Sequence, residues 1–309
     1  MNDPLLTIFS TPKPFTNPHI RVIQGNALTS WVNLGSQVKV ILIGKETGVK
    51  QAAEKYGIDF FPQVKRNSLG TPLISSMFEI ARNHSKSPFL AILNTDVMLT
   101  PDCLDALKKA ANSFKKFVLA GQRWDLVMKE AVKYHPGFYN RLLKWVRQSG
   151  RRHPPMGSDY FIFPRDCYVD VPEFAIGRAG WDNWMLYKSR FEGWPLIDAS
   201  DAITAVHQDH DYSHLANGQP HYHLPETRQN VTLAGGDYTI FLLRDCTHRF
   251  CKDEIKSLPF SLSRLWRELE ILPLTRWHSR KWGEVFFYLF HPVKWYWFLR
   301  SKIKKMISG

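Results

Sequence analysis

The sequence predicts an α/β protein with a mixed, mostly parallel sheet flanked by helices, followed by a C-terminal helical extension rich in basic and aromatic residues. Short apolar runs with the length of buried strands alternate four times with segments of helical periodicity, which is typical of a parallel sheet covered on both faces. Hydrophobic residues make up 44% of the 309 positions, which is enough for a large core. From about residue 257 the composition changes, and basic and aromatic side chains dominate.

The first half of the chain supplies the alternation. Strands are predicted at residues 5–9, 38–43, 58–61 and 89–93, and helices between them at residues 18–34, 49–56 and 73–83. Gly35 and Gly57 end the first two predicted helices, as glycine often does. A further helix is predicted over residues 101–111, because Thr100 can cap it and Pro101 fits its first position.

The second half continues the pattern with one interruption. Strands are predicted at residues 117–121, 160–163 and 203–206, and helices at residues 181–192 and, on the surface, 225–235. Between them, residues 124–155 are basic and are predicted to form a helical insertion over one end of the sheet. We therefore expect one unit over residues 1–256, with halves at 1–123 and 124–256, and an extension over 257–309.

Composition limits the classes of partner and compartment. The net charge of +13 and the pI near 9.6 indicate an anionic partner, such as nucleic acid, acidic lipid or a phosphorylated substrate. The four cysteines form no CxxC pair, which argues against a disulfide framework or a zinc knuckle. The N-terminus lacks the features of a signal peptide, so we expect a cytoplasmic protein. Neither GxGxxG nor GxxxxGK[ST] is present, which argues against dinucleotide or Walker-type phosphate binding.

One stretch of the predicted sheet leads directly into polar residues. The strand at residues 89–93 runs into Asn94, Thr95 and Asp96, just before the helix predicted at 101–111. Ligands of open α/β sheets bind at the carboxyl ends of strands, so Asp96 is a candidate ligand of a divalent metal. The structural alternative is an aspartate that caps a turn after a strand.

Two further polar sites follow predicted strands. Asp182 lies within Ala179-Gly180-Trp181-Asp182-Asn183-Trp184, and His207 begins His207-Gln208-Asp209-His210-Asp211-Tyr212-Ser213-His214. With Asn94-Thr95-Asp96, their order and spacing over residues 5–215 resemble the GT-A glycosyltransferases, the nucleotide-diphospho-sugar transferase superfamily. In that family a strand-end DxD-type motif binds Mn²⁺ or Mg²⁺ with the sugar nucleotide, a later acid faces the acceptor, and a C-terminal histidine often completes the metal shell.

The resemblance implies a role for each motif. Asp96 and His207 would bind the metal, and Asp182 would be the catalytic base. The donor would be bound through residues of the nucleotide-binding half 1–123, namely Thr11, Arg66, Asn67, Asn94 and Asp96. In the acceptor half 124–256, the sugar and acceptor would contact Asp159, Trp181 and Asn183. The sequence departs from the pattern at Asn94, where the family has aspartate, and at Trp181, where many members have glutamate.

The residue types suit this chemistry independently. A carboxylate and an imidazole can hold a hard cation that neutralises a leaving diphosphate, and one histidine among oxygen ligands is compatible with Mn²⁺. Asp182 at a helix N-terminus can stay ionised as a base, although it can equally be a simple helix cap. His210 and His214 are alternatives to His207, and the histidines of residues 207–223 raise zinc as another possibility.

The C-terminal extension indicates a second partner. Between Arg276 and Lys305 Glu284 is the single acid, and aromatic residues alternate with lysine and arginine. This pattern suits a helix that lies on an anionic membrane surface, although a helix packed on the protein is the alternative. We expect a peripheral protein at the inner face of a membrane, and nucleic acid is the less favoured partner because no nucleic-acid motif is present.

These observations predict a metal-dependent glycosyltransferase. It would move a hexosyl or pentosyl unit from a nucleotide-diphosphate sugar to a hydroxyl of a glycan or lipid-linked acceptor, with inversion, as in polysaccharide biosynthesis. One alternative is a sugar-nucleotide pyrophosphorylase, although the glycine-rich loop that such an enzyme needs is missing after the first strand. The other is a non-catalytic GT-A-like protein that binds a membrane or nucleic acid.

Overall fold

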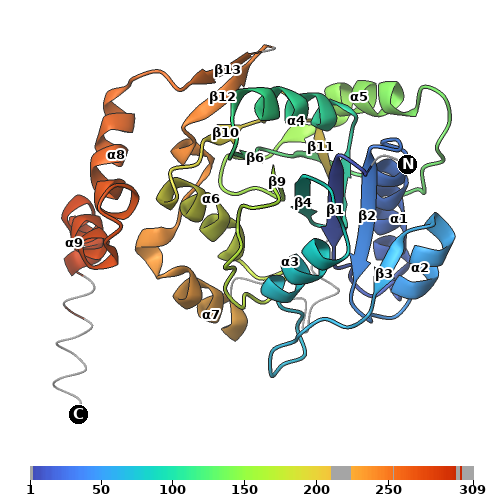
Figure 1. The fold of residues 1–309 in the computed structure, drawn as a ribbon, viewed down its shortest axis with the longest axis horizontal. Helices are drawn as coiled ribbons and strands as arrows, with labels where there is room; N and C mark the ends of the chain where they lie inside the picture. Colours follow the sequence, from blue (N-terminus) through green and yellow to red (C-terminus); the bar gives the residue numbers. More distant parts are fainter. Residues whose placement is uncertain (1–2, 210–223, 253, 297–299, 301–309) are drawn as a thin grey trace.

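The computed structural model describes residues 3–209, 224–252, 254–296 and 300. Within them a nine-stranded sheet has the order β13-β12-β10-β6-β9-β4-β1-β2-β3 (Figure 1). The pairs within β3-β2-β1-β4 and within β6-β10-β12 are parallel, whereas β9 and β13 run antiparallel to their neighbours. The predicted mixed, mostly parallel sheet flanked by helices is therefore confirmed.

The strand–helix alternation of the first half is also confirmed. Its elements are β1 (Leu6–Ser10), α1 (Pro18–Val32), β2 (Val38–Ile43), α2 (Val49–Tyr56), β3 (Asp59–Phe61), α3 (Ile74–Asn83), β4 (Phe89–Leu93) and α4 (Asp102–Ser113). Local chemistry sets several of the boundaries. Asn17 caps α1 by accepting hydrogen bonds from the amides of His19 and Ile20, and Gly57 ends α2 in the left-handed region.

The second half contains β6 (Val118–Ala120), β9 (Tyr160–Pro164), α6 (Trp181–Phe191) and α7 (Pro225–Ala234), close to the predicted elements. The prediction of a helical insertion over residues 124–155 is wrong at both ends. Only α5 (Phe138–Ser149) is helical there, and it lies between the strands β7 (Trp124–Leu126) and β8 (Arg151–Arg152). These strands, like β5 (Val97–Leu99) and β10 (Leu196–Asp198), are too short to show a period in the sequence.

A separate four-stranded sheet has the order β5-β11-β7-β8. Its strand β11 (Ala205–Gln208) lies further along the chain than the predicted strand at 203–206, so His207 is inside the strand rather than beyond its end. In β11, Val206 points into the core, whereas His207 is only partly buried. This small sheet is the feature that positions the candidate site.

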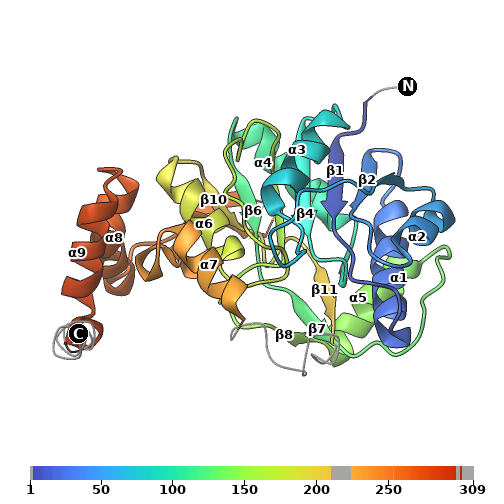
Figure 2. The same cartoon turned by 90° about the horizontal axis from the view of Figure 1, so that it is seen from below.

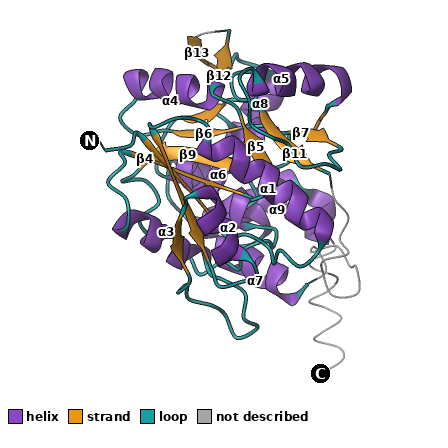
Figure 3. Ribbon diagram, turned by 90° about the vertical axis from the view of Figure 1, so that its right-hand side faces the viewer, coloured by secondary structure: helices purple, strands orange, loops and turns teal. Residues whose placement is uncertain are grey.

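Both faces of the large sheet are buried (Figure 3). On one face Leu6 and Ile8 of β1 join a core with α1, α2, α4 and α5. On the other face Phe9 joins a core with α3, α6 and α8 (Leu262–Thr275). The alternation along β1 is expected because successive side chains of a strand point to opposite faces.

The C-terminal part contains β12 (His248–Cys251), β13 (Glu254–Ser257), α8 and α9 (Arg280–Phe290). The two helices lie together at the end of the molecule opposite α1 and α2 (Figure 2). Helix α7 forms where a surface helix was predicted and has exposed residues, whereas its residues Glu226, Thr227 and Asn230 are buried against the preceding loops. Over the described residues, no helix is both long enough and apolar enough to span a membrane.

Candidate metal and transfer site

The small sheet brings together three acidic or imidazole side chains that are far apart in sequence. In its register, His207 of β11 is the partner of Val97 in β5 on one side and of Asp125 in β7 on the other. Asp96 directly precedes β5. Its main-chain carbonyl accepts two hydrogen bonds of 3.2 Å from Gln208, one from the main-chain amide and one from the side chain. Asp96, Asp125 and His207 therefore meet because of strand pairing.

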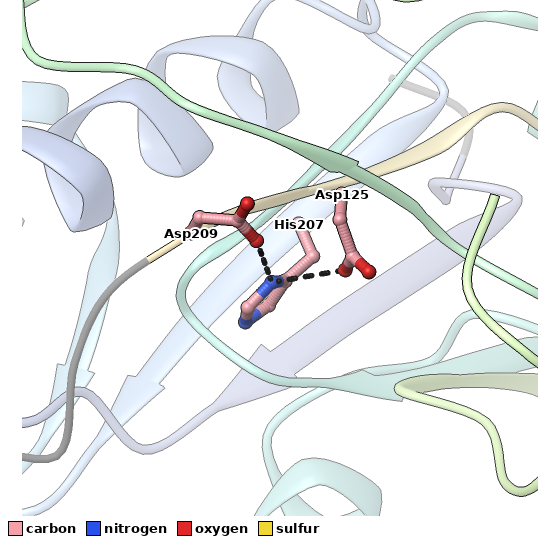
Figure 4. A group of neighbouring side chains, drawn as sticks. All are labelled: Asp125, His207 and Asp209. Atoms are coloured by element: carbon pink, nitrogen blue, oxygen red, sulfur yellow. Dashed lines mark ion pairs between the residues drawn. The ribbon is translucent and has the colours of Figure 1, made fainter. Parts of the chain in front are cut away.

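His207 has carboxylates near both of its ring nitrogens, and Figure 4 shows the two near Nδ1, those of Asp125 and Asp209. Its Nε2 lies 4.0 Å from Oδ1 of Asp96, and its Nδ1 lies 3.4 Å from Oδ1 of Asp125 and 3.7 Å from Oδ1 of Asp209. Burial alone would lower the pKa of His207, but the carboxylates of Asp125, Asp209 and Asp96 raise it to about 9. The imidazole is therefore protonated at neutral pH in this state of the protein.

Asp125 holds the imidazole in place and was not expected from the sequence. Its carboxylate is 3% exposed and accepts hydrogen bonds of 2.8 Å from Arg123 and from His153. Burial would raise its pKa, but hydrogen bonds from His207, His153 and Arg123 keep the pKa well below the ordinary range. The segment had been predicted to be helical, and no pattern in a three-residue strand would have identified it.

The donor groups fit a hard divalent cation. Asp125, Nδ1 of His207 and Asp209 offer ligand atoms within 4.8 Å of one another. On the other side of the ring, Asp96 and Nε2 of His207 offer a second, overlapping pair. Because Asp125 already accepts bonds from Arg123 and His153, it suits the role of the carboxylate that orients a metal-binding histidine. The pair of Asp96 and His207 is then the better candidate for the metal itself.

Lys13 is the competing cation at this site. Its Nζ lies 2.9 Å from Oδ2 of Asp96, and the carboxylate is 7% exposed. A metal bound to Asp96 and His207 would have to displace the proton of the imidazole and weaken this ion pair. Lys13 was not predicted as a site residue, because a lysine in a loop after a strand has no sequence pattern that would distinguish it.

The side chain of Asn94 bonds the carboxylate of Asp159. Its Nδ2 donates to Oδ1 of Asp159 over 3.0 Å, and Nη1 of Arg123 lies 2.6 Å from the other oxygen of Asp159. Arg123 in turn bonds Asp125. A chain of hydrogen bonds and ion pairs therefore joins the predicted acceptor residue Asp159 to the imidazole of His207.

The candidate base Asp182 lies in the first turn of α6, after Gly180 in the left-handed conformation. Burial, and to a smaller extent the charge of Asp159, raise the pKa of Asp182 to about 6, against the opposing effect of backbone amides. Gly157 lies directly beside it, since a Cβ at Gly157 would be 2.4 Å from Oδ2 of Asp182.

Trp181 and Asn183, on either side of this base, make structural contacts. Trp181 is buried and packs against Phe161 with ring centroids 5.8 Å apart. Asn183 donates to the carbonyl of Phe241 over 2.9 Å. Their predicted contacts with sugar remain predictions.

A second group of the predicted residues lies at the carboxyl ends of β1 to β3. A Cβ at Gly44 would lie 2.3 Å from Oε2 of Glu46 and 3.3 Å from the methyl carbon of Thr11, so these side chains are neighbours. Arg66 pairs with Glu46 over 2.9 Å. The atoms Thr11 Oγ1, Glu46 Oε2 and Arg66 Nη2 are buried and have no hydrogen-bond partner among the residues that the structure describes. Buried polar atoms normally have partners, so this group suits a polar ligand.

Two other predictions have different outcomes. Asn67 donates to Oε1 of Glu226 over 2.6 Å, while Arg178 binds the other oxygen of that carboxylate over 2.7 Å, so Asn67 anchors α7. The alternatives His210 and His214 lie outside the described residues.

The fold and the site together define a mixed α/β protein with a candidate divalent-metal site beside the ends of its parallel strands. No family model and no curated protein matches the chain. Similar solved structures include the mannosyltransferase PcManGT from Pyrobaculum calidifontis in complex with GDP-Man and Mn²⁺, at a TM-score of 0.44 and 14% identity. The match covers 69% of this chain and 59% of that one.

Two further structures are similar to this chain. TarS 1-349 from S. aureus, in complex with UDP-GlcNAc, has a TM-score of 0.46 and 10% identity over 74% of this chain and 65% of that one. Glucosyl-3-phosphoglycerate synthase from Mycobacterium tuberculosis, in complex with Mn²⁺, UDP and glucosyl-3-phosphoglycerate, has a TM-score of 0.43 and 13% identity over 84% and 88%. The chain thus spans less than two thirds of the length of PcManGT and of TarS 1-349.

Proposed function

We propose that this chain is a metal-dependent glycosyltransferase that moves a sugar from a nucleotide-diphosphate sugar to a hydroxyl acceptor. The observation that carries the proposal is the convergence of Asp96 and His207, with Nε2 of the ring turned to Asp96 and Asp125 behind Nδ1. Mn²⁺ suits this combination of carboxylate and imidazole, and Mg²⁺ is the alternative. When bound, the cation would supply the positive charge that stabilises the leaving diphosphate.

The donor would extend from the metal site toward the ends of β1 to β3. There Thr11, Glu46 and Arg66 present buried polar atoms that a ribose or a base could bond. Lys13 follows Thr11 by two positions in the chain, and its ammonium group bonds Asp96. It can turn to a diphosphate oxygen once the cation neutralises that carboxylate.

Asp182 would accept the proton of the acceptor hydroxyl. Its pKa of about 6 leaves it ionised at neutral pH yet more basic than an ordinary aspartate, which favours proton transfer. A base placed to deprotonate the acceptor favours direct displacement and inversion at the anomeric carbon. Asn94 and Asp159 would hold this side of the site, and Trp181 and Asn183 would support the start of α6.

The acceptor is proposed to be a glycan or a lipid-linked saccharide. The support for a lipid-linked acceptor is the exposed aromatic and basic surface of the C-terminal helices, which suits peripheral contact with an anionic membrane such as the inner face of the plasma membrane. Trp277, Trp282 and Trp295 are all at least half exposed there. Residues 297–299 and 301–309, part of the basic segment predicted to bind membranes, lie outside the described residues.

A thermal-shift panel of UDP- and GDP-sugars with and without Mn²⁺ tests the proposal. A donor at about one hundred times its Kd should stabilise the folded protein by about 2.7 kcal/mol, and only when the metal is present. Asp96→Asn and His207→Ala should each abolish the metal-dependent part. Asp105→Asn, which changes an exposed acid of α4, is the matched control and should behave as the wild type.

Transfer is then measured as donor turnover. Metal-dependent donor binding together with hydrolysis or transfer of the sugar supports the glycosyltransferase. Release of pyrophosphate from a nucleoside triphosphate and a sugar phosphate would instead show a pyrophosphorylase. If donors bind equally well with and without metal and none turns over, the enzymatic proposal is wrong.

A further inference from the structure

A pocket of about 470 Å³ lies between the β12–β13 region and the two C-terminal helices, in a part of the protein that the donor site does not use. Its basic lining residues are Arg244, Arg249, Arg264 and Arg267, and the hydroxyls of Ser261 and Ser263 lie beside them. Trp266 and Phe290 form an apolar wall. A cavity of this size, lined by both guanidinium groups and aromatic rings, suits an amphipathic anion.

The positive charge of this pocket exceeds its negative charge. Of its acids, Glu268 pairs with Arg190 over 2.6 Å and with Arg264 over 3.6 Å, and Glu270 pairs with Arg267 over 2.7 Å. Arg244 and Arg249 are exposed and form no ion pair with another described residue. Arg249 also lies directly opposite Lys256 in the β12–β13 pairing, and like charges in that position repel. Lys256 is itself paired with Glu254 over 2.9 Å, so Arg249 is the residue of the two that has no acidic partner among the described residues.

An exposed apolar stripe on α8 begins beside the pocket. Leu262, Leu265, Trp266 and Leu269 recur at the spacing of one helix face, and they are 78, 42, 62 and 40% exposed. The opposite face of α8 is buried, through Ile271 and Leu274. Helix α8 thus packs on the protein with one face and presents a second apolar face outward.

Helix α9 continues this surface. Trp282, Val285 and Leu289 form a similar stripe and are 55, 53 and 68% exposed. The two helices are in contact, and Trp266 of the α8 stripe packs on Phe290 at the end of α9 with ring centroids 4.7 Å apart. Both helices lie side by side at one end of the molecule, away from α1 and α5 (Figures 1 and 2).

We propose that this surface is a binding site for an anionic phospholipid, with the lipid phosphate held by Arg244 and Arg249 and the α8 and α9 stripes inserted among the acyl chains. The occupant follows from complementarity, because the same surface offers exposed leucine and tryptophan side chains beside the guanidinium groups of Arg244 and Arg249, which form no ion pair with a described residue. Arginine binds phosphate through charge and paired donors. Amphipathic helices that lie in the headgroup layer have this arrangement.

The site extends the proposed membrane contact but does not depend on sugar transfer. To α9, which lies in the segment from Arg276 onward that the composition had indicated, it adds α8, Arg244 and Arg249, which lie before that segment. Truncation would be a poor test, since Leu274 of α8 is part of the core. Substitution of exposed residues in the full chain avoids this problem.

Flotation of the full-length protein with vesicles provides the test. Vesicles of phosphatidylcholine alone are compared with vesicles that also contain phosphatidylglycerol. Arg244→Gln with Arg249→Gln should lower partitioning into the anionic vesicles roughly fivefold per charge removed. Arg141→Gln with Arg147→Gln is the matched control, because it removes the same charge from the exposed surface of α5, far from α8. Leu262→Ser should also lower partitioning, whereas Val169→Ser, which is 66% exposed and lies between β9 and α6 in the chain, should not.

Further arms identify the source of the anion. Vesicles with cholesteryl hemisuccinate at the same surface charge carry carboxylate in place of the additional phosphate, and weaker binding to them supports a phosphate site. Equal binding to the phosphatidylglycerol and the cholesteryl hemisuccinate vesicles would contradict a phosphate site in the pocket. So would an equal loss of partitioning in the Arg244/Arg249 variant and in the Arg141/Arg147 control. If the protein binds inorganic phosphate but not the vesicles, the pocket takes free phosphate and the proposed lipid site is wrong. A concentration-dependent dimer in light scattering that Leu262→Ser abolishes would show that a second copy covers the surface instead.

Donor binding is measured on the same variants. The glycosyltransferase proposal and the lipid-site proposal can be tested separately. Arg244 and Arg249 lie outside the donor site, so their substitution should leave metal-dependent donor binding unchanged. Loss of membrane partitioning with intact donor binding is the expected result.

Discussion

The Nδ2 of Asn94 donates a 3.0 Å hydrogen bond to Oδ1 of Asp159, and this contact gives a physical reason for an asparagine in place of the first acid of a DxD motif. A carboxylate at position 94 would face the carboxylate of Asp159, which Arg123 already holds from its other side. The amide can donate where an ionised aspartate cannot.

Restoring the motif should therefore harm the protein. Asn94→Asp should lower the free energy of unfolding by about 1–2 kcal/mol, because a hydrogen bond is replaced by repulsion. Urea denaturation measures this change. The double variant Asn94→Asp with Asp159→Asn should recover part of the lost free energy of unfolding, because an amide and a carboxylate again face each other with their positions exchanged. Stability equal to that of the wild type together with tighter Mn²⁺ binding would mean that position 94 faces the metal.

Asp125 is expected to act through His207. Asp125→Asn removes the carboxylate behind Nδ1, so the imidazole loses its orientation and basicity, and Mn²⁺ affinity should fall about 10- to 100-fold. Titration of the donor-free protein with Mn²⁺, followed by electron paramagnetic resonance, measures the affinity. Asp166→Asn, at an exposed acid, is the control. Unchanged affinity in the Asp125 variant would remove this residue from the site.

Lys13 should compete with the metal for Asp96. In Lys13→Met the carboxylate no longer has an ammonium group 2.9 Å away, so Mn²⁺ should bind roughly fivefold more tightly in the absence of nucleotide, as expected for a partly exposed pair of about 1 kcal/mol. Lys13→Arg retains the charge and should behave as the wild type. Calorimetry of both variants gives the comparison, and weaker binding to Lys13→Met would show that the lysine supports the metal site.

The fall of kcat/KM at acid pH should reflect protonation of Asp182. Its pKa is raised to about 6, so the protonated, inactive form accumulates below that pH and kcat/KM should rise as pH increases through about 6. Asp159→Asn removes a nearby negative charge and should move this limb to lower pH. Profiles are recorded at saturating Mn²⁺, and a limb that stays in place in Asp182→Asn would assign the titration to another group.

Gly157 should tolerate no side chain beside the base. The Cβ of Gly157→Ala would lie 2.4 Å from Oδ2 of Asp182, so the carboxylate must shift, and kcat should fall by up to roughly a hundredfold with donor affinity unchanged. Gly25→Ala makes the same chemical change in α1 and serves as the control. Equal rates in the two variants would place the chemistry away from Asp182.

Much of the fold could be predicted because the long elements have strong local signals. Strands β2 and β4 and helices α1, α2 and α3 are each long enough for an apolar run or a helical period to be recognised in the sequence. The strands β5, β7 and β10 have three residues each, and a three-residue run looks the same in a strand, a helix or a loop. The small sheet was therefore missed, and with it Asp125.

The sequence by itself determined the alternating α/β pattern, the position of Asp96 after its strand, Asp182 at its helix start and the amphipathic C-terminal helices. These depend on neighbouring residues, and local propensity and periodicity express them directly. The tertiary structure alone decided which nitrogen of His207 faces which carboxylate. It also decided that Lys13 forms an ion pair with Asp96 and that Asn94 bonds Asp159. Those contacts join residues that strand pairing brings together from distant parts of the chain, and no local pattern encodes the pairing of short strands.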